Sequence, residues 1–217
     1  MTLNIRPIQG AAELEAVRQH RQAVHAGELG FRALPEDSPF AVADAALDIS
    51  GHLFGAFDGS RLVASVRVNY GETSLPEGGF GPYAALYGME RFGPMFPSQI
   101  SVVTKLVAEP AWRSGTLMSQ FGVELYTHTR DTQPQVMFCL IDCVPMLKAF
   151  FEQIGYRQIG PPFQHPTAGK VLPLAFAVYD QQHFTKIGSP LAAVCPWHDT
   201  ASVDWFERRF AAELVED

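Results

Sequence analysis

The chain has 217 residues, of which 47% are hydrophobic and 18% charged, so it can bury a core of domain size and is not a disordered chain. Its formal net charge of −7 argues against a general nucleic-acid binder, although it leaves room for one local basic pocket for a phosphorylated cofactor. Three cysteines, no apolar leader segment within residues 1–18 and no apolar run of about 18 residues predict a soluble, reduced, cytoplasmic protein with a single domain over residues 1–217.

The first third of the chain predicts a helix, a loop and a hairpin. Residues 11–29 are rich in helix formers, and one face of this helix is expected to carry Leu14, Val17, Arg21 and Val24. Two prolines and several acids predict a loop or irregular segment over residues 31–50. Two apolar runs flank the turn signal Asp58-Gly59, so residues 52–68 are predicted to form a hairpin.

The middle of the chain begins with an aromatic segment. Residues 71–99 combine many glycines and prolines with aromatic side chains and predict a long loop or short-helix insertion that could cover an apolar substrate. A strand is expected over residues 100–108, a helix over 116–130 and a buried strand over 136–141. Pro145 is expected to start a helix that Gly155 ends, with one face formed by Met146, Ala149, Phe150 and Ile154.

The last strands are expected at residues 156–159 and 172–179. The Pro/Gly-rich stretch 160–170 separates them. Residues 185–217 contain Trp197 and Trp205 and are expected to form a C-terminal extension with a packed helix, not a separate domain.

The most informative stretch is 103–115, where an apolar run ends and an Arg-x-Gly turn opens the expected helix. Free backbone N–H groups and the positive end of the helix dipole make such a turn suitable for anions, and Arg113 adds a planar donor fork for phosphate. We expect a site for the pyrophosphate of coenzyme A or the phosphopantetheine of a carrier protein, formed by Arg113, Ser114, Gly115 and Thr116. The alternatives are a solvated arginine and an ordinary loop glycine.

The order of elements resembles the GNAT acyltransferase fold: helix, hairpin, strand, phosphate turn, helix, strand, helix and a final strand pair. Residues 150–156, Phe-Phe-Glu-Gln-Ile-Gly-Tyr, resemble the later "Tyr-x-x-x-Gly-Phe" segment of that family. The resemblance implies an α/β (α+β) fold of the GNAT-like acyl-CoA N-acyltransferase type, with a central mixed twisted sheet flanked by helices.

A narrower resemblance lies in the flanking segments. Scattered patches over residues 21–190 are similar to acyl-homoserine-lactone synthases and long-chain N-acyl amino acid synthases. These patches are Arg21-x-x-Val24, Asp44-x-x-x-Asp48, His52-Leu53-Phe54, Val66-Arg67-Val68, Thr167-x-Gly169-Lys170-Val171-Leu172-Pro173, Asp180, His183-Phe184 and Ser189-Pro190.

The chain departs from these families at two positions. Phe151 stands where GNAT enzymes often carry a tyrosine that protonates the leaving thiolate. Val102 stands where lactone synthases carry a glutamate, three residues before a basic residue that Lys105 represents here. The resemblance therefore bears on the fold and on thioester binding more than on the chemistry.

The implied reaction is the attack of an amine on an acyl thioester. In this fold a backbone N–H of the central strand usually polarises the thioester carbonyl, which the resemblance places among Leu106, Val107 and Ala108. One such donor stabilises the transition state by roughly 3–4 kcal/mol.

Acidic and basic residues are candidates for the acceptor amine. Asp48 could orient or deprotonate the amine, or it could be a helix cap or loop carboxylate. Arg67, in an apolar strand, could face inward and bind an acceptor carboxylate, or it could face water. Lys105 could face a cleft or pair with Glu109 or Asp142, while Asp44 and Arg21 are secondary candidates.

Other features suggest less specific roles. Asp142-Cys143 follows a strand end, where α/β sites often lie, but no histidine nearby in sequence could activate the cysteine. The segment 195–199 lacks a second ligand pair, so no metal site is expected. Aromatic residues in 80–96, with Phe138, Phe150 and Phe151, could line an acyl channel or simply pack in the core.

The sequence as a whole predicts an N-acyltransferase that moves an acyl group, with a long chain as one option, from acyl carrier protein or acyl-CoA to the amine of a small acceptor such as an amino acid. The alternatives are an acetyl-CoA-dependent acetyltransferase and a non-catalytic module that binds acyl thioesters. A carrier protein would need a local basic patch, for which Arg91, Arg113 and Lys148 are the candidates.

Overall fold

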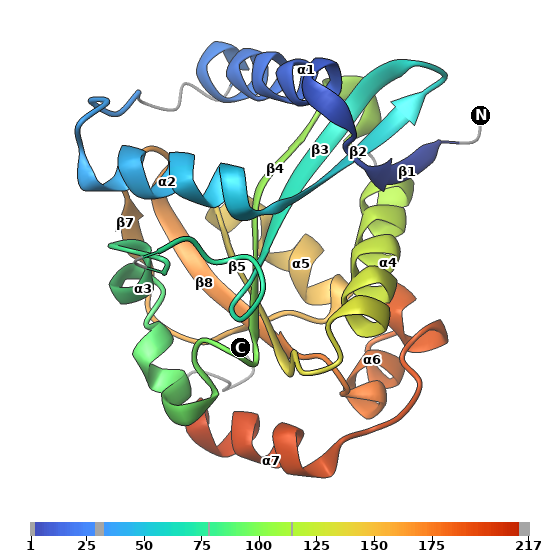
Figure 1. The fold of residues 1–217 in the computed structure, drawn as a ribbon. Coiled ribbons are helices and arrows are strands. Elements are labelled where there is room, and N and C mark those ends of the chain that lie inside the picture. The colour runs from blue at the N-terminus through green and yellow to red at the C-terminus, as the bar shows by residue number, and fades with distance from the viewer. Residues whose placement is uncertain (1–2, 29–32, 78, 114, 213–217) are drawn as a thin grey trace.

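An eight-stranded mixed sheet forms the centre of the computed structural model, which describes residues 3–28, 33–77, 79–113 and 115–212 (Figure 1). The strands lie in the order β1-β2-β3-β4-β5-β8-β6, and β7 pairs with β8 outside this path. The pairing of β4 with β5 is parallel and the other pairings are antiparallel. The bounds are β1 Asn4–Pro7, β2 His52–Asp58, β3 Arg61–Tyr70, β4 Ile100–Ala108, β5 Phe138–Cys143, β6 Arg157–Gln158, β7 Phe163–His165 and β8 Gly169–Ala177.

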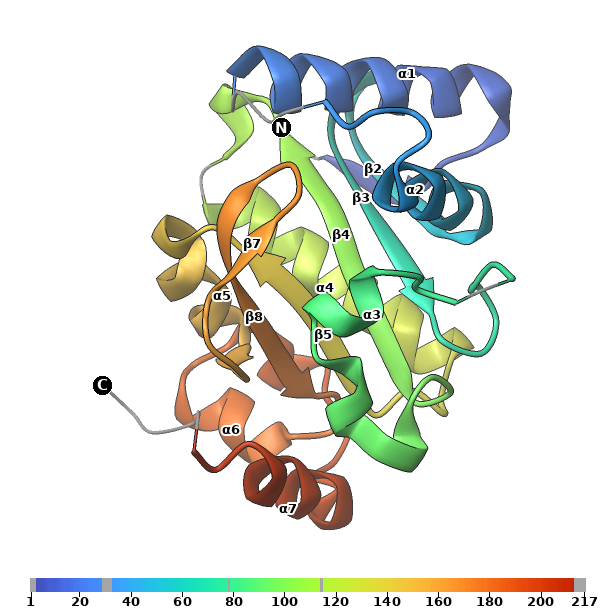
Figure 2. The same cartoon turned by 90° about the vertical axis from the view of Figure 1, so that its left-hand side faces the viewer.

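Helices cover both faces of this sheet (Figures 1 and 2). One face, called here the α2/α3 face, carries α2 (Pro39–Ser50), α3 (Tyr83–Leu86) and α7 (Thr200–Arg209). The other, the α4 face, carries α4 (Gly115–Thr132) and α5 (Lys148–Ile154). Helix α1 (Gly10–Gln22) lies across one end of the sheet, and α6 (Gln181–Lys186) follows β8. The predicted fold class is thus confirmed.

The two faces bury separate apolar clusters because the central strands are covered on both sides. In β8 the residues from Val171 to Ala177 are all buried, which explains their continuous apolar run. On the α4 face, Val103, Cys139 and Ile141 pack with the inner sides of α4 and α5. On the α2/α3 face, Val102, Phe138 and Leu140 pack with side chains of α3 and α7.

Several predicted elements are confirmed. The hairpin forms around Gly59, whose φ of +62° is the left-handed conformation that the turn signal predicts. The strand predicted over 100–108 coincides with β4. Gly155 ends α5 with φ +132°, and a Cβ there would lie 2.4 Å from the ring of Phe184. The glycine is therefore required both by the backbone turn and by close packing.

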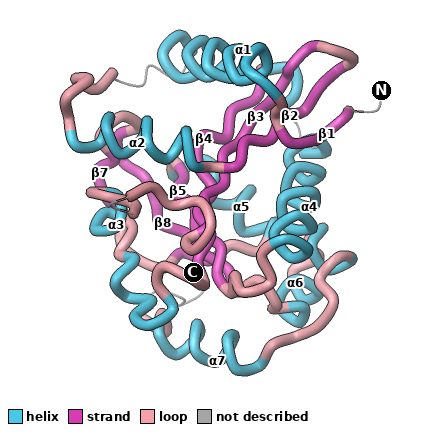
Figure 3. Tube along the Cα trace, viewed as in Figure 1, coloured by secondary structure: helices cyan, strands magenta, loops and turns pink. Residues whose placement is uncertain are grey.

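The loop predicted over residues 31–50 is wrong, because residues 39–50 form α2 (Figure 3). The Ser38 hydroxyl accepts a hydrogen bond from the backbone N–H of Ala41 at 3.2 Å, so Ser38 caps the helix. Pro39 occupies the first helical turn, where its missing N–H and fixed φ favour the helix. The proline interpreted as a helix breaker is a helix starter.

Three smaller differences follow from local geometry. The Pro/Gly-rich stretch 160–170, where no strand was predicted, contains β7, which pairs with β8 in the register Phe163 to Val171. Met146 is 86% exposed and does not belong to the inner face, because a 3₁₀ turn over Pro145–Leu147 precedes α5. The predicted C-terminal helix is present as α7, and the short helix α6 before it was not predicted. None of the helices in the described ranges has the length and apolar character that crossing a bilayer requires.

Candidate functional site

The sheet opens between β4 and β5. Their parallel pairing ends at Val103 and Ile141, and two residues later Lys105 has φ +56°, a left-handed conformation inside a strand. The pairing of β3 with β4 shifts at the same place, so that Lys105 and Leu106 form a bulge opposite β3. A non-glycine residue in this conformation costs roughly 1–2 kcal/mol. Such strain clusters at functional sites, which makes this opening the starting point of a candidate site.

The end of β4 lies beyond this bulge. Val107 pairs with Ser65 of β3, and Ala108 with Ala64. Among the described residues, no strand pairs with this stretch on the side that faces β5. The backbone polar groups on that side therefore face the opening. A substrate carbonyl could accept a hydrogen bond from such an N–H. The polarising role predicted for Leu106, Val107 and Ala108 stays a prediction.

The predicted anion site has the expected strand–turn–helix geometry. A 3₁₀ turn over Pro110–Trp112 leads to Arg113, and α4 begins at Gly115. The Nε of Arg113 donates a hydrogen bond to the carbonyl oxygen of Ala108 at 2.9 Å, which holds the guanidinium at the end of β4. Gly115 and Thr116 belong to the first turn of α4, whose backbone N–H groups lack helical acceptors. Ser114 lies outside the described residues, and phosphate binding stays a prediction.

A charged cluster lies on the α2/α3 face beside the bulge; its members are Arg21, Asp44, Asp48, Arg67 and Lys105. Arg67 is its centre and is 2% exposed. The guanidinium Nη1 lies 3.0 Å from Asp48 Oδ1, and Nη2 lies 2.9 Å from Asp44 Oδ1. Nε donates to the Thr104 hydroxyl at 2.9 Å, and Nη1 also donates to the Asp44 carbonyl oxygen at 3.1 Å. Arg67 therefore faces inward, and these contacts leave a single N–H for another partner.

Two further ion pairs complete the cluster. Lys105 Nζ lies 2.6 Å from Asp44 Oδ2, and Arg21 Nη1 lies 2.7 Å from Asp48 Oδ1. The partners predicted for Lys105, Glu109 and Asp142, are wrong, because Glu109 pairs instead with Arg61 across the strands. Asp48 is not a helix cap: it lies in the last turn of α2. The side chains of Lys105 and Asp48 are 23% and 32% exposed, so both are open to solvent.

Three cations and two carboxylates give the cluster one excess positive charge. Burial alone would raise the pKa of Asp44, but Lys105 and Arg67 outweigh burial and lower that pKa. Burial likewise opposes the charge of Arg67, but Asp44 and Asp48 raise its pKa. Burial, assisted by Lys105 and Arg21, lowers the pKa of the neighbouring His25 to about 4. His25 is therefore neutral at physiological pH, and the two aspartates of the cluster are held by cations.

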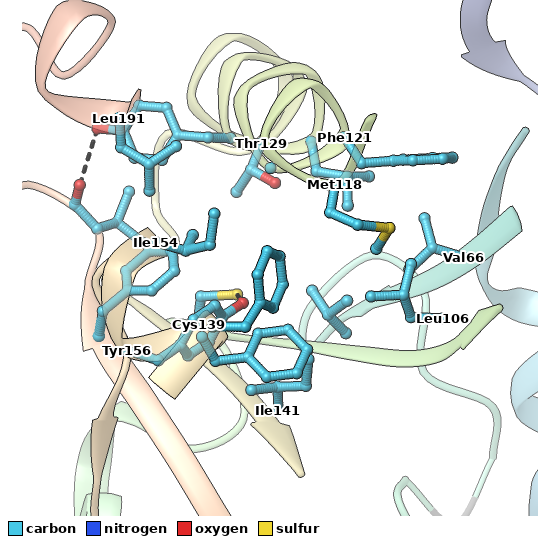
Figure 4. A pocket seen from close by; sticks show the side chains of 18 residues that line it. Val66, Leu106, Met118, Phe121, Thr129, Cys139, Ile141, Ile154, Tyr156 and Leu191 are labelled. Atoms are coloured by element: carbon cyan, nitrogen blue, oxygen red, sulfur yellow. Dashed lines mark hydrogen bonds between the residues drawn. The ribbon is translucent and has the colours of Figure 1, made fainter. Parts of the chain in front are cut away.

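An apolar cavity of about 60 Å³ lies on the α4 face (Figure 4). Val66, Leu106 and Met118 bound one side of it, and Ile154, Tyr156 and Leu191 bound the other. Adjacent residues of the bulge thus belong to different places: Lys105 to the charged cluster and Leu106 to the cavity. The few polar groups in the lining have protein partners. For example, the Tyr156 hydroxyl lies 3.2 Å from Cys139 Sγ, and the Tyr126 hydroxyl donates to the Val178 carbonyl oxygen at 2.8 Å.

The aromatic residues predicted to line an acyl channel divide between the two faces. Phe150 and Phe151 do line the cavity. In contrast, Phe138 and the aromatic residues from the 80–96 segment pack on the α2/α3 face, so they do not line this cavity. Phe151 is buried and has no hydroxyl to protonate a thiolate, and Val102 is buried in the core of the α2/α3 face.

A second polar group lies on the α2/α3 face at the end of β5. The Tyr87 hydroxyl donates to Asp142 Oδ1 at 3.0 Å, and the ring of His165 stacks on Tyr83 with 5.8 Å between the ring centroids. The place of Asp142 near a strand end indicated a candidate site residue, whereas no pattern in the sequence indicated a role beside it for Tyr87, Tyr83 or His165. Their separation from Asp142 in the chain hides them, and His165 lies in the Pro/Gly-rich stretch where no strand was predicted.

The basic patch predicted for a carrier protein does not form as predicted. Arg91 donates to the carbonyl oxygen of Ile159 and lies over the ring of Phe210, 4.5 Å from its centroid. Arg91 precedes β4 and Arg113 follows it, and nine strand residues span about 30 Å. Arg91 is therefore too far away to share a patch with Arg113.

The cysteines of the described chain are buried. Burial raises the pKa of Cys143 to about 12, so this thiol stays protonated. Within the described ranges, no three His, Cys, Asp or Glu side chains gather in a way that could hold a metal ion.

Comparison with known proteins shows a similar fold at low sequence identity. No protein-family model matches the chain, and no curated protein matches its sequence. Among solved structures, FeeM, an N-acyl amino acid synthase from uncultured soil microbes, superposes with a TM-score of 0.68 at 18% identity, covering 86% of this chain and 97% of FeeM. An acyl-CoA N-acyltransferase from Pseudomonas aeruginosa gives 0.55 at 16% identity over 81% of this chain and 99% of that chain.

The AHL synthase LasI is also similar, with a TM-score of 0.52 at 10% identity over 82% of this chain and 90% of LasI. These similarities show that the chain has the acyl-CoA N-acyltransferase (GNAT) fold, as its sequence resemblance implied.

Proposed function

We propose that this chain, which has the GNAT fold, is an N-acyltransferase that moves an acyl group from a thioester to the amine of a small acceptor. One observation carries the proposal: the opening of β4 lies between the apolar cavity and the charged cluster. A thioester carbonyl at this opening would have its acyl chain on the α4 face and its acceptor on the α2/α3 face. The N-acyl amino acid synthase and AHL synthase among the similar structures support the same reaction class.

The donor would be acyl-CoA or the acyl-phosphopantetheine of a carrier protein. Arg113 and the first turn of α4 would bind its phosphate, because both present N–H donors at the end of β4. The pantetheine arm would then run toward the opening and pair with the free edge of β4. Within this proposal, Leu106, Val107 and Ala108 supply the N–H that polarises the thioester carbonyl.

The acceptor would enter beside the charged cluster. Lys105 and Asp48 are partly exposed, so Lys105 would attract an acceptor carboxylate and Asp48 its ammonium group. Arg67 would act as a positioning residue, because four of its N–H groups already hold Asp44, Asp48 and Thr104. An amino acid carries both of the charges that this arrangement selects.

The reaction forms a carbon–nitrogen bond and breaks a carbon–sulfur bond. The neutral amine attacks the polarised carbonyl carbon, the tetrahedral intermediate expels the thiolate, and the amine's remaining extra proton ends on the thiol. Phe151 supplies no proton for this step. A thiolate is a good enough leaving group to depart without full protonation by the protein.

The acyl chain length is the finer part of the proposal. The lining of the cavity is almost wholly apolar, which favours a long acyl chain. Its volume of about 60 Å³, however, is below the roughly 150 Å³ of a cavity that holds benzene. A long chain would require Met118 and other lining side chains to move, whereas an acetyl group would not. The volume therefore keeps the acetyltransferase as a second candidate, and Phe151 and Val102 keep the non-catalytic binding module as a third.

The proposal extends to the whole chain as one GNAT domain over residues 1–217, with 71–99 as an insertion and 185–217 as an extension. The test is thiol release from acyl-CoA and acyl carrier protein thioesters of increasing chain length, with and without a pool of amino acids. Amine-dependent release supports the transferase, and the preferred length and donor identify the acyl group and its carrier. Tight thioester binding without release would instead support the binding module.

A further inference from the structure

Asp142 lies at the opening of the sheet, next to the last residue pair that joins β4 and β5. Side chains alternate along β5: Cys139, Ile141 and Cys143 belong to the core of the α4 face, and Phe138 and Leu140 belong to the other core. By this alternation the carboxyl group of Asp142 lies on the α2/α3 face. It is therefore on the acceptor side of the opening, together with the charged cluster.

The position of Asp142 is fixed by an aromatic support. Tyr87, which is 7% exposed, donates its hydroxyl to Asp142 Oδ1 at 3.0 Å. The Tyr87 ring stacks on Tyr83 at 6.0 Å and meets the edge of Phe163 at 5.7 Å. These contacts join α3 and β7 over the end of β5 and hold the carboxyl group in one orientation.

Asp142 differs from the aspartates of the charged cluster. Asp44 and Asp48 each lie within 3.0 Å of cationic nitrogen atoms, and Lys105 and Arg67 lower the pKa of Asp44. Among the described residues, no lysine or arginine lies within ion-pair distance of Asp142, and the hydroxyl of Tyr87 donates a hydrogen bond to its carboxyl group. Burial raises the pKa of Asp142, although His165, the Tyr87 hydroxyl, the backbone N–H of Asp142 and Lys105 oppose this effect. A carboxylate with a raised pKa is a stronger base.

His165 faces the same place but cannot serve as the base. Its Nδ1 accepts hydrogen bonds from the backbone N–H groups of Thr167 and Ala168, both at 3.2 Å. The neutral ring therefore carries its hydrogen on Nε2 and has no free lone pair. Burial lowers the pKa of His165, although Asp142 opposes this effect, and the ring therefore stays neutral at physiological pH. The remaining titratable groups near Asp142 are Tyr83, Tyr87, Lys105 and Cys143.

We propose that Asp142, held by Tyr87, is the general base that takes a proton from the ammonium group of the acceptor. This inference rests on the proposed acyl transfer and names the residue that prepares its nucleophile. The Asp142 carboxylate accepts one proton from R–NH₃⁺ and later releases it to solvent. The amine lone pair then forms the bond to the thioester carbon, the thiolate leaves, and the second nitrogen proton passes to the thiol.

The decisive variant is Asp142→Asn, which keeps the size and shape of the side chain and removes its basicity. Amide formation is measured with acetyl-CoA and dodecanoyl-CoA as donors, against the pool of twenty amino acids and against hydroxylamine. Hydroxylamine is a free base at neutral pH and needs no base to activate it. The matched control is Asp204→Asn, an exposed carboxylate on α7.

The expected result is a fall in kcat/KM for amino acids of roughly 10²–10⁴-fold in Asp142→Asn, the usual contribution of a general base. Hydroxylamine turnover and acyl-CoA affinity should stay within about threefold of wild type, because neither needs the base. An unchanged kcat/KM for amino acids, or an equal loss with hydroxylamine, would overturn the proposal. Wild-type protein without any amine-dependent turnover would overturn the proposed function itself, which is a different result.

A second variant, Tyr87→Phe, tests the same base through pH. The Tyr87 hydrogen bond lowers the pKa of Asp142, so its loss should raise that pKa. The acid limb of the pH profile of kcat/KM should therefore move to higher pH in Tyr87→Phe, and it should disappear in Asp142→Asn. A merely structural role for Tyr87 would lower the rate at every pH and leave the limb in place, which would contradict the proposal.

Discussion

Replacement of Arg67 by methionine tests whether the charged cluster holds β3, β4 and α2 together on the α2/α3 face of the sheet. Arg67 is 2% exposed and joins β3 to α2 and β4 through Asp44, Asp48 and Thr104. Methionine keeps much of the length of the side chain and removes its charge and its donors. Breaking a buried ion pair by removing one partner typically costs about 3–5 kcal/mol.

The remaining ion pairs indicate where in this range the loss of stability should fall. Asp44 keeps Lys105 at 2.6 Å and Asp48 keeps Arg21 at 2.7 Å, so neither carboxylate is left without a cation. We therefore expect the lower end, about 3 kcal/mol, which corresponds to a fall in Tm of roughly 6–12 °C for a chain of this size.

Urea titration followed by circular dichroism measures the free energy of unfolding, and calorimetry measures Tm. Arg208→Met is the matched control, because Arg208 is exposed and 4.0 Å from its partner Asp204. Its loss should change stability by less than about 1 kcal/mol. A loss below 1 kcal/mol in Arg67→Met as well would refute the view that Arg67 organises the cluster.

Three further predictions concern the donor, the pH dependence and the cavity. Arg113→Ala should weaken acyl-CoA binding about tenfold, because it removes one charge-assisted contact of about 1.5 kcal/mol, and it should change Tm little. If calorimetric titration shows an unchanged affinity, the phosphate binds elsewhere. The pKa of Asp44 is lower in the folded than in the unfolded chain, so its stabilisation is present above about pH 4 and is lost as the pH falls through the folded pKa. As the pH is lowered from 5, the free energy of unfolding of Asp44→Asn should therefore fall less than that of the wild type, as measured by urea titration at each pH. An equal fall in both proteins would contradict the ion pairing of Asp44. Gly122→Ala should raise the free energy of unfolding by about 0.5–1 kcal/mol, because alanine favours the helix and its Cβ would lie at an ordinary contact distance of 3.7 Å from Ile154. A lower free energy of unfolding in this variant would show that α4 and α5 pack more closely than described.

Most of the strands could be predicted from the sequence because their signals are local, whereas β1 and β7 were not predicted. Asp58-Gly59 fixes one hairpin, and the apolar run over 100–108 ends where β4 ends. The helix α2 was missed because Pro35 and Pro39 were interpreted as breakers, although Ser38-Pro39 is also a helix-start signal. The same residues read with capping in mind would have predicted the helix.

The site could be predicted only where family resemblance supplied long-range information. Asp48, Arg67 and Lys105 come together in the structure, but the ion pair of Lys105 with Asp44 depends on a left-handed backbone that no local pattern in the strand indicates. Tyr87 and Asp142 are 55 residues apart, and no spacing rule connects them. Contacts of this kind depend on the tertiary fold, so they become visible only once the sheet and its covering helices are in place.

The central claim is that the opening of β4 is a place where an acyl group passes from sulfur to nitrogen. The most direct measurement is mass spectrometry of a single-turnover mixture of the protein, an acyl thioester and the pool of amino acids. We expect an N-acyl product formed in step with free thiol. Free carboxylic acid as the product, or intact thioester after prolonged incubation, would contradict the claim.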